Sequence, residues 1–476
     1  MENRLVTLDR LILKPGDLEM SLPIALTAVI VVLYSVIGSL YAINTPLWQA
    51  PDEPAHYAYV RQVAEGGCCP LMQPSDWDAD ALSAAVSAGF PAGTDLNAIS
   101  YQDHQPPLYY LVASLPYLAT GGNPIAIRFL SVAFGAGTVI GVFLIGFRLF
   151  PRRPMIGVAA AIFVAFLPQH LAIMGSINND SLAGIILVMV ITVTLYYVGN
   201  PIHDSSEFGP NAPLHISHRP HALALGALVG VAYLTKLTIY GPATLAVAAA
   251  ILWRWRGEGH DGRWLAQQIA WAAGVALLIG GLWWGRNLVV YGGLDLLAQG
   301  AHRAAVIGQP LTADLIGQVG LLGYLGQAIT TTFNSFFGQF GWMAVPLPRR
   351  EYGLILAFLI FCAVGLILGW RNPEREPRQA AQRAGTSILA IVAAISLIGY
   401  ITYNLTFLQL QGRYLFPLLA PLAVLLAVGL SGWAGFVQRR LPKLGKWVAW
   451  LPVILLSWWP LYALWALYRH LIPNLS

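Results

Sequence analysis

Long apolar runs separated by short polar segments make up most of the chain. A helix needs about 20 apolar residues, each rising about 1.5 Å, to cross the roughly 30 Å hydrocarbon core of a membrane. The pattern therefore predicts an all-α fold, a polytopic integral membrane protein of about 11 transmembrane helices. The predicted spans lie near residues 22–43, 125–149, 154–174, 181–199, 221–235, 238–253, 265–289, 352–370, 386–407, 415–433 and 447–469.

The first run follows a polar lead of residues 1–21. It is longer than the apolar region of a signal peptide, which has about 7 to 15 residues, so we expect it to stay in place as a membrane anchor. Residues 106–119 form a shorter apolar stretch that is too short to span comfortably. Its two leading prolines suit the start of an interfacial or re-entrant helix.

The run from His221 to Trp253 fits either one long helix or two short ones. A single helix would extend about 50 Å and would put Lys236 near its middle. Two short spans that turn at residues 235–238 place Lys236 at the end of a helical hairpin, and they keep the later basic residues on one side of the membrane. We expect the hairpin. A charge held at membrane depth is costly unless it is paired, which makes Lys236 a functional candidate.

Basic residues gather in alternate loops. Arg4, Arg10 and Lys14 precede the first span, and most of the 27 Lys and Arg fall on the same predicted side. The positive-inside rule makes that side cytoplasmic, and it places the N-terminus and residues 371–384 there.

The long polar segments fall on the opposite, extracytoplasmic side. Residues 44–124 form a first loop with juxtamembrane helices, and residues 290–351 form a second large loop. The segment 200–220 is expected to be a solvated loop on the cytoplasmic side. Neither an internal repeat nor a separate soluble domain is evident, so residues 1–476 are expected to form a single transmembrane domain in the cell membrane.

Composition supports this topology. Hydrophobic residues make up 57% of the chain and charged residues only 10%, which excludes a soluble globular core. The net charge of +5 does not require a nucleic-acid partner, because the basic residues are distributed by membrane side. A bridge between the neighbours Cys68 and Cys69 would be strained, so a structural disulfide is not expected there. The three cysteines show no metal-binding spacing.

Candidate chemistry begins in the stretch from Trp48 to Tyr57, directly after the first span. Its second proline suits the first turn of a helix, so Asp52 or Glu53 would be the N-cap and residues 55–65 the helix. Capping alone would explain Asp52. It does not explain the second carboxylate, or His56, which lies at i+4 from Asp52 and so on the same helix face. Asp52 and Glu53 are therefore the candidate catalytic residues.

Further polar residues flank the predicted spans on the same side. Each of these residues also has an ordinary structural explanation. The acidic residues and His104 lie at helix starts that they could cap, and arginines beside aromatic residues are common anchors at the membrane interface. His170 and Gln169 are expected to be satisfied polar groups rather than ligands. The candidates for substrate binding are His56, Asp103, His104, Asp180, Lys236, Arg286, Arg413 and Tyr414.

These residues carry more information together than singly. Carboxylates beside cationic groups at a membrane surface suit a reaction that deprotonates an acceptor and stabilises an anionic leaving group. A phosphate anchored in lipid is the natural anion at that depth.

The same residues resemble the motifs of the GT-C superfamily of membrane glycosyltransferases, which includes protein O-mannosyltransferases, aminoarabinose transferases and oligosaccharyltransferases. Asp52-Glu53 followed by His56 is similar to the superfamily's catalytic first-loop motif. Residues 104–108, His-Gln-Pro-Pro-Leu, resemble the H-x-P-P-L segment of the O-mannosyltransferase-like branch. The motifs around Lys236, Arg286, Phe337–Trp342 and Arg413 look like those of a poorly characterised bacterial branch.

The resemblance implies a polyprenyl-phosphate-linked sugar as donor and a membrane-lipid environment. It also implies transfer on the extracytoplasmic face, usually with inversion, to an acceptor that the sequence does not identify. Asp52 would be the general base. Lys236, Arg286 and Arg413 would hold the lipid phosphate, which leaves as an anion and needs no strong general acid.

The remaining roles are implied in the same way. Glu53, His56 or Asp103 would orient the acceptor or the sugar. Some superfamily members use a divalent cation, Mg or Mn, bound by first-loop carboxylates, which here would be Asp52 and Asp103.

The chain departs from the oligosaccharyltransferases in lacking their large soluble carboxy-terminal domain and their W-W-D-Y-G signature, which disfavours asparagine-linked transfer. Two other classes of function stay open. A lipid-linked sugar transporter or flippase would place charges near the midplane among discontinuous helices, and only Lys236 hints at that. A non-catalytic membrane subunit would need no carboxylate cluster.

Overall fold

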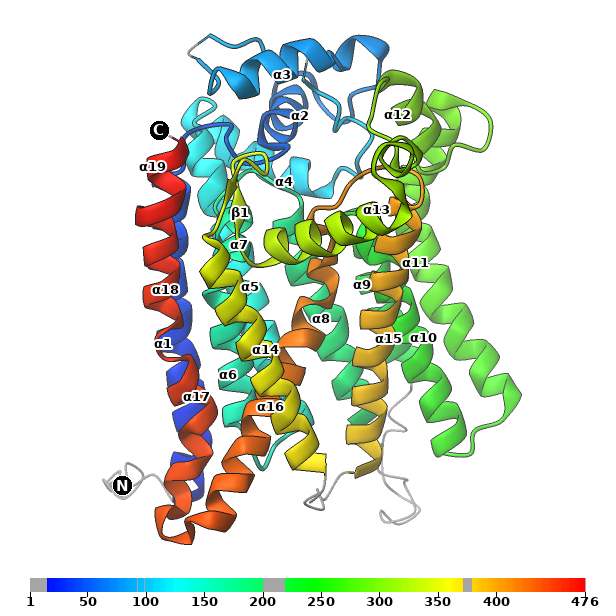
Figure 1. The fold of residues 1–476 in the computed structure, drawn as a ribbon. Coiled ribbons are helices and arrows are strands. Elements are labelled where there is room, and N and C mark those ends of the chain that lie inside the picture. The colour runs from blue at the N-terminus through cyan, green and yellow to red at the C-terminus, as the bar shows by residue number, and fades with distance from the viewer. Residues whose placement is uncertain (1–14, 92, 98, 200–218, 371–378, 476) are drawn as a thin grey trace, which may run out of the picture.

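The computed structural model describes residues 15–91, 93–97, 99–199, 219–370 and 379–475 (Figure 1). Within these ranges the chain is almost entirely helical, which confirms the expected all-α class. The helices are α1 (Pro15–Asn44), α2 (Glu53–Gly66), α3 (Ala79–Ser87), α4 (Leu108–Thr120), α5 (Pro124–Leu149), α6 (Met155–Ala165), α7 (Pro168–Met174), α8 (Asp180–Gly199), α9 (Arg219–Tyr233), α10 (Tyr240–Gly257), α11 (Gly262–Tyr291), α12 (Gln299–Ala305), α13 (Thr312–Phe337), α14 (Arg349–Trp370), α15 (Gln379–Asn404), α16 (Leu419–Arg440), α17 (Leu451–Leu456), α18 (Trp459–Ala466) and α19 (Ile472–Leu475).

Short elements complete the described chain. The strands β1 (Gln339–Phe340) and β2 (Val345–Pro346) form one antiparallel pair, with Phe340 opposite Val345. The 3₁₀ or π-helical segments are η2 (Pro74–Asp76), η3 (Leu237–Ile239), η4 (Gly412–Leu418), η5 (Pro442–Trp450) and η6 (Leu467–Leu471).

Nine helices among the described residues are long and apolar enough to cross a membrane, and each overlaps a predicted span. The helices α6 and α7 reach that standard only as a pair, and they meet at a 64° bend. Pro168 begins the second of the pair because its ring cannot continue the helix before it. The apolar helix α9 has only 15 residues. The prediction of about 11 spans is therefore not confirmed, because the described residues give nine, or ten if the bent pair is one span.

The predicted turn in the run 221–253 is confirmed. The helix α9 ends at Tyr233, η3 follows Lys236, and Tyr240 begins α10. The Lys236 side chain reaches the first residue of α8, so this hairpin ends beside the start of another membrane helix.

Backbone contacts fix the helix that follows η4. A Cβ atom added to Gly365 of α14 would lie 2.0 Å from the carbonyl oxygen of Gly429 in α16, and one added to Gly432 would lie 1.9 Å from that of Gly365. Only glycine permits this approach, which is a common way of packing helices in a membrane. The packing holds α16 and, just before it, the turn that carries Arg413.

The two long connections lie together at one end of the bundle, which we call the loop end (Figure 1). Residues 45–123 connect α1 to α5 and contain α2, α3 and α4, whereas residues 292–348 connect α11 to α14 and contain α12 and α13. The indole Nε1 of Trp77 in the first connection donates to the carbonyl oxygen of Ile307 in the second at 2.9 Å. A small apolar core contains side chains of both, so the two connections form one layer over the bundle.

Part of the predicted topology concerns residues outside the described ranges. These are the loops at 200–218 and 371–378 and the basic residues Arg4, Arg10 and Lys14. The direction of the chain across the membrane therefore stays a prediction.

Candidate functional site

Asp52 lies at the N-cap position of α2, but its side chain does not cap the helix. Its backbone is left-handed, with φ of 68°, and the carboxylate makes no capping hydrogen bond. The carboxylate instead accepts from the Tyr101 hydroxyl at 2.5 Å and from the guanidinium of Arg413. A second Arg413 nitrogen donates to the Pro51 carbonyl oxygen at 3.2 Å. The capping alternative therefore fails for this residue.

Electrostatics keep the Asp52 carboxyl ionised. Burial raises its pKa, but Arg413, His56 and the Tyr101 hydroxyl outweigh burial and hold the pKa at about 2. Asp52 is thus a carboxylate at neutral pH, with an arginine and a tyrosine fixing its direction. This arrangement suits a group that accepts a proton or aligns a hydroxyl.

Glu53, its neighbour, faces a different surrounding. Its oxygens accept from Nε and Nη2 of Arg128 at 2.7 and 2.6 Å, and both side chains are fully buried. The backbone N–H groups of Trp48 and Ile177 donate to the same carboxylate at 3.0 Å each. Glu53 was expected to be a second catalytic group, but its carboxylate is occupied by four donors. The contacts make it a structural tie between α2, α5 and the turn before α8.

Arg128 is the partner that sequence reasoning missed. It lies in the first turns of α5 and also donates to the carbonyl oxygens of Ala42, Thr45 and Pro46, at 2.8, 2.7 and 3.2 Å. The sequence does mark Arg128 as a candidate, because it lies inside an apolar run and a charge at such a position needs a partner.

His56 packs inside the loop layer. Its Nδ1 lies 2.8 Å from the Tyr110 hydroxyl, and the two rings stack. Burial lowers the pKa of His56 to about 3, so the imidazole is neutral. The His56 backbone N–H donates to the Asp52 carbonyl oxygen at 3.0 Å, so the two residues are one turn apart at the start of α2.

Asp103 is a buried carboxyl that forms no ion pair within the described ranges. Its Oδ2 accepts from the Gln62 amide at 2.9 Å, while Oδ1 has no partner among the described residues. Burial raises the pKa of Asp103 to about 8, so this carboxyl holds its proton at neutral pH. Asp52 and Asp103 therefore differ in protonation state.

His104 and a histidine of the second connection form a pair. The His104 Nδ1 lies 3.1 Å from the Tyr101 carbonyl oxygen, and the Gln105 amide lies 3.1 Å from its Nε2. Its ring centroid is 4.0 Å from that of His302 in α12. Burial lowers the pKa of both rings, that of His302 to about 4. His302 was missed because nothing in the sequence aligns α12 with the first loop.

Asp180 and Lys236 form an ion pair with 2.6 Å between Oδ1 and Nζ, and each side chain is 8% exposed. The backbone hydrogen bond at the start of α8 goes to the side chain of Asn178 and not to that of Asp180. Asn178 Oδ1 accepts from the backbone N–H of Asp180 at 2.9 Å. The Asp180 Oδ2 atom is buried and has no partner among the described residues. The pair is electrostatically coupled to Arg413 and Asp52, so these four charges belong to one cluster.

A cavity of about 30 Å³ lies beside this cluster, between α5, α7, α8 and η4. Asp180 lines it together with Thr138, His170 and Phe416. The His170 ring interacts with the backbone of Val164, but neither ring nitrogen makes a hydrogen bond of good geometry among the described residues, so the expectation of a satisfied histidine stays a prediction. Gln169 is satisfied, because its Oε1 accepts from the Gln339 N–H at 2.8 Å.

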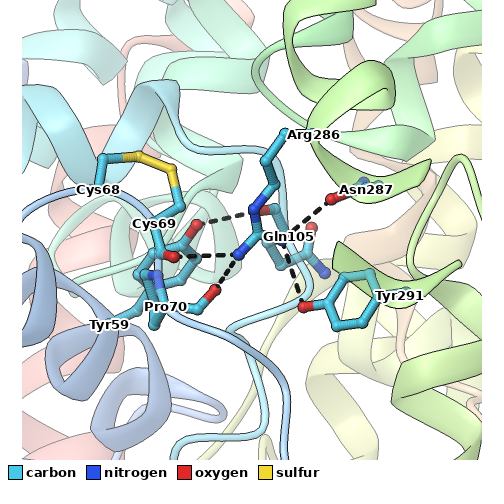
Figure 2. Close-up of a disulfide and its surroundings, with 8 residues drawn as sticks. All are labelled: Tyr59, Cys68, Cys69, Pro70, Gln105, Arg286, Asn287 and Tyr291. Atoms are coloured by element: carbon cyan, nitrogen blue, oxygen red, sulfur yellow. Dashed lines mark hydrogen bonds between the residues drawn. A yellow bond between two sulfur atoms is a disulfide. The ribbon is translucent and has the colours of Figure 1, made fainter. Parts of the chain in front are cut away.

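Arg286 serves a different part of the loop layer (Figure 2). One guanidinium nitrogen donates to the carbonyl oxygens of Cys69, at 3.0 Å, and Pro70. Another donates to Asn287 Oδ1 at 3.0 Å and to the Tyr291 hydroxyl at 3.3 Å. These hydrogen bonds go to the loop rather than to Asp52, Arg413 or Lys236. The structure thus does not bring Arg286 into the charged cluster.

The segment held by Arg286 contains a disulfide between Cys68 and Cys69 (Figure 2). The expectation that these cysteines stay unbridged was wrong.

Arg413 and Tyr414 enter the site from η4. The guanidinium lies 5.2 Å from the centre of the Tyr414 ring, and Arg413 is 2% exposed. Its Nε is buried and has no acceptor among the described residues. The cluster therefore retains one unused cationic donor.

The donor set does not fit the divalent cation, Mg or Mn, that the resemblance implied. Arg413 and Tyr101 engage the carboxylate of Asp52, and Gln62 engages that of Asp103. Within the described ranges, no three His, Cys, Asp or Glu side chains gather where they could hold a metal ion.

Comparisons with known proteins agree on the class of fold. The model of a family described as "Predicted membrane protein (DUF2142)" matches residues 72–423. No curated protein matches the chain. The oligosaccharyltransferase AglB from Archaeoglobus fulgidus, in complex with an inhibitory peptide and a dolichol-phosphate, is similar with a TM-score of 0.52 and 15% identity over 94% of this chain and 56% of that one. The apo form of the Archaeoglobus fulgidus oligosaccharyltransferase gives a TM-score of 0.51 and 15% identity, over 94% and 55% of the two chains.

ArnT from Cupriavidus metallidurans bound to undecaprenyl phosphate gives a TM-score of 0.49 and 18% identity, over 95% of this chain and 73% of that one. The chain spans just over half the length of the oligosaccharyltransferases it matches. At these identities the likeness to them shows the fold alone.

Proposed function

This chain belongs to the DUF2142 family of predicted membrane proteins and has a GT-C fold, and we propose that it is a glycosyltransferase. Its donor is a sugar linked to a polyprenyl phosphate, and its acceptor is a hydroxyl group on a glycan, lipid or protein. AglB carries a dolichol-phosphate, which supports a polyprenyl-phosphate partner for the shared fold.

One observation carries the proposal. An ionised aspartate, Asp52, lies on a left-handed turn where it gives up helix capping and is aimed by Arg413 and Tyr101. A carboxylate that forgoes its local structural role and is oriented from 361 residues away is arranged for chemistry rather than for folding alone.

In the proposed reaction Asp52 accepts the proton of the acceptor hydroxyl. The acceptor oxygen forms a bond to the anomeric carbon as the bond from that carbon to the phosphate oxygen breaks, and the lipid phosphate leaves with the electron pair. A single displacement of this kind inverts the anomeric centre. The leaving group is already an anion, so cations and not a strong general acid are needed.

Arg413 and Lys236 supply those cations. Arg413 has a buried Nε without an acceptor among the described residues, which a phosphate oxygen would satisfy. Lys236 lies in the same charged cluster through Asp180. When a phosphate shares Arg413 with Asp52, the hold on Asp52 weakens and its basicity rises, which helps proton transfer.

The other candidates take supporting roles in this proposal. Glu53 positions Asp52 through Arg128 rather than touching substrate. His56 and Asp103 keep the loop layer in place, while His104 and Tyr414 border the cluster and face the substrates. Because Arg413 supplies positive charge beside Asp52, we expect transfer to continue in the presence of EDTA.

The site is proposed to face the extracytoplasmic side. A membrane-impermeant thiol reagent should reach a cysteine placed at exposed Asp80 in intact cells, because Asp80 lies in the first connection. Reagent access only after the membrane is opened would put Asp52 on the cytoplasmic side and overturn the proposed donor and topology together.

The direct test is a screen with purified protein in detergent. Polyprenyl-phosphate sugars with a radiolabelled sugar would be offered with acceptor glycans, lipids and peptides, and mass spectrometry would identify the product. Transfer with release of polyprenyl phosphate supports the proposal. Movement of the intact lipid-linked sugar between leaflets of vesicles, without transfer, would favour the transporter instead.

A further inference from the structure

The helix α13 lies across the bundle at the loop end, at a steep angle to the neighbouring α14 and α15 (Figure 1). Hydrogen bonds set its depth. Thr312 Oγ1 and the Tyr324 hydroxyl donate to the carbonyl oxygen of Asn404, the last residue of a candidate membrane span, at 2.8 and 3.2 Å. At its other end Ser335 Oγ accepts from the N–H of Gly412, the first residue of another span, at 2.7 Å.

Both ends of α13 are thus tied to the ends of membrane-spanning helices. A helix held in this way runs along the boundary between hydrocarbon and water rather than through the membrane. A break at Gly320, where φ is 72°, divides it into two pieces.

The outward face of the longer piece is apolar. Leu322, Leu325 and Ile329 follow the i, i+3, i+7 spacing of one helix face, and their exposed fractions are 84%, 43% and 70%. Leu321 beside them is 58% exposed. Large apolar side chains gathered at this exposure mark a contact surface. Leu397 in the candidate span α15 and Leu405 just after it are also exposed, at 45% and 70%.

The C-terminal part of α13 contacts the turn that carries Arg413. A Cβ atom added to Gly412 would lie 2.3 Å from the backbone nitrogen of Phe336 and 2.5 Å from the carbonyl oxygen of Thr332. Gly412 is followed directly by Arg413, the partner of Asp52. The position of α13 therefore sets the position of Arg413.

We propose that α13 is a membrane-surface helix whose face formed by Leu321, Leu322, Leu325 and Ile329 is covered by lipid chains of the leaflet at the loop end. This lipid contact seats α13 against Gly412 and so holds Arg413 at the site. The proposal concerns the membrane and not the substrate, so it stands whether or not the proposed transfer reaction is found.

The test places a nitroxide label on Leu322→Cys in the Cys362→Ala background, which removes the free cysteine. The full chain is reconstituted in vesicles of phosphatidylethanolamine and phosphatidylglycerol. Collisions of the label with oxygen, which concentrates in lipid, are compared with collisions with a water-soluble nickel chelate. Leu397→Cys on a span gives the lipid reference, and Arg303→Cys, exposed on α12, gives the water reference.

We expect the label at 322 to match the label at 397, with a loss of nickel collisions relative to the label at 303. A label at 322 that behaves like the one at 303 would overturn the proposal, because the face would be in water. Loss of both kinds of collision would also overturn it and would indicate a second copy of the chain on this face. Ile329→Cys repeats the test at a second position on the same face if the first variant does not fold.

Discussion

Two adjacent carboxylates, Asp52 and Glu53, each pair with a distant arginine, and the two pairs differ in how fully they are used. The Glu53–Arg128 pair is fully buried, and the two side chains hydrogen-bond to each other and to backbone groups. In the Asp52–Arg413 pair the side chains are 17% and 3% exposed, and the arginine keeps an unpartnered Nε. The two pairs therefore differ in how many of their hydrogen-bonding groups are already occupied, and the pair proposed to react is the one with a free donor among the described residues.

The difference follows from where each arginine originates. Arg128 comes from α5 and donates to carbonyl oxygens of the last turn of α1 and of the residue that follows it, so it connects two membrane helices. Arg413 comes from η4, whose first N–H, that of Gly412, donates to Ser335 of α13. The Arg413 Nε has no acceptor among the described residues, so this pair can still bind an anion.

The largest expected effect is on the saturated pair. Arg128→Met leaves the Glu53 carboxylate buried without its cation, which should cost about 3 to 5 kcal/mol of stability. Thermal unfolding of the purified protein in detergent measures this. The matched double variant Glu53→Gln with Arg128→Met removes both charges and should recover most of the loss. A single variant with wild-type stability would show that the pair is not the tie we describe.

A smaller effect separates Arg413 from Arg286. Arg413→Gln should weaken binding of undecaprenyl phosphate by roughly 1.5 to 3 kcal/mol, because it removes a charge-assisted contact. Arg286→Gln should leave binding near that of the wild type, since its donors hold Cys69 and Pro70. Titration of the lipid into detergent-solubilised protein compares them. Weaker binding by Arg286→Gln, with unchanged binding by Arg413→Gln, would instead indicate that the phosphate binds at α11.

A further effect is a pH dependence at Asp103, whose carboxyl accepts from Gln62. Burial raises its folded pKa to about 8, above the unfolded value of about 3.9. The stability that the neutral group contributes is therefore fully present below pH 4 and is lost as the pH rises through 8. Asp103→Asn should flatten this decline between about pH 4 and 8. Melting temperatures measured across that range, with exposed Asp80→Asn as the control, should show a change in slope for Asp103→Asn alone.

Much of the fold could be predicted because apolar length and turn residues act locally. The runs of apolar residues located the spans, and the placement of Lys236 located the turn between α9 and α10. The predicted number of spans is not confirmed for two reasons. Pro168 begins a second helix at a bend of 64° within one apolar run, and α9 is too short to count as a span.

The site was less predictable because its contacts are distant in sequence. The residue types around Asp52 pointed to a charged cluster, but the choice of partner did not follow from them. Arg413 is 361 residues from Asp52, and Arg128 is 75 residues from Glu53. The left-handed backbone of Asp52 also removes the cap that the sequence favoured. His302 reaches His104 only because the two long connections pack together.

The most direct measurement compares Asp52→Asn with Glu53→Gln for both sugar transfer and melting temperature. Asp52→Asn keeps the shape of the side chain but loses the proton acceptor, so turnover should fall by about 10² to 10⁴. Its melting temperature should fall less than that of Glu53→Gln, because the Asp52 side chain is 17% exposed whereas Glu53 is fully buried. Glu53→Gln should lower the melting temperature, because the Arg128 charge is left buried without its partner. Wild-type transfer by Asp52→Asn would contradict the account and remove Asp52 from the reaction.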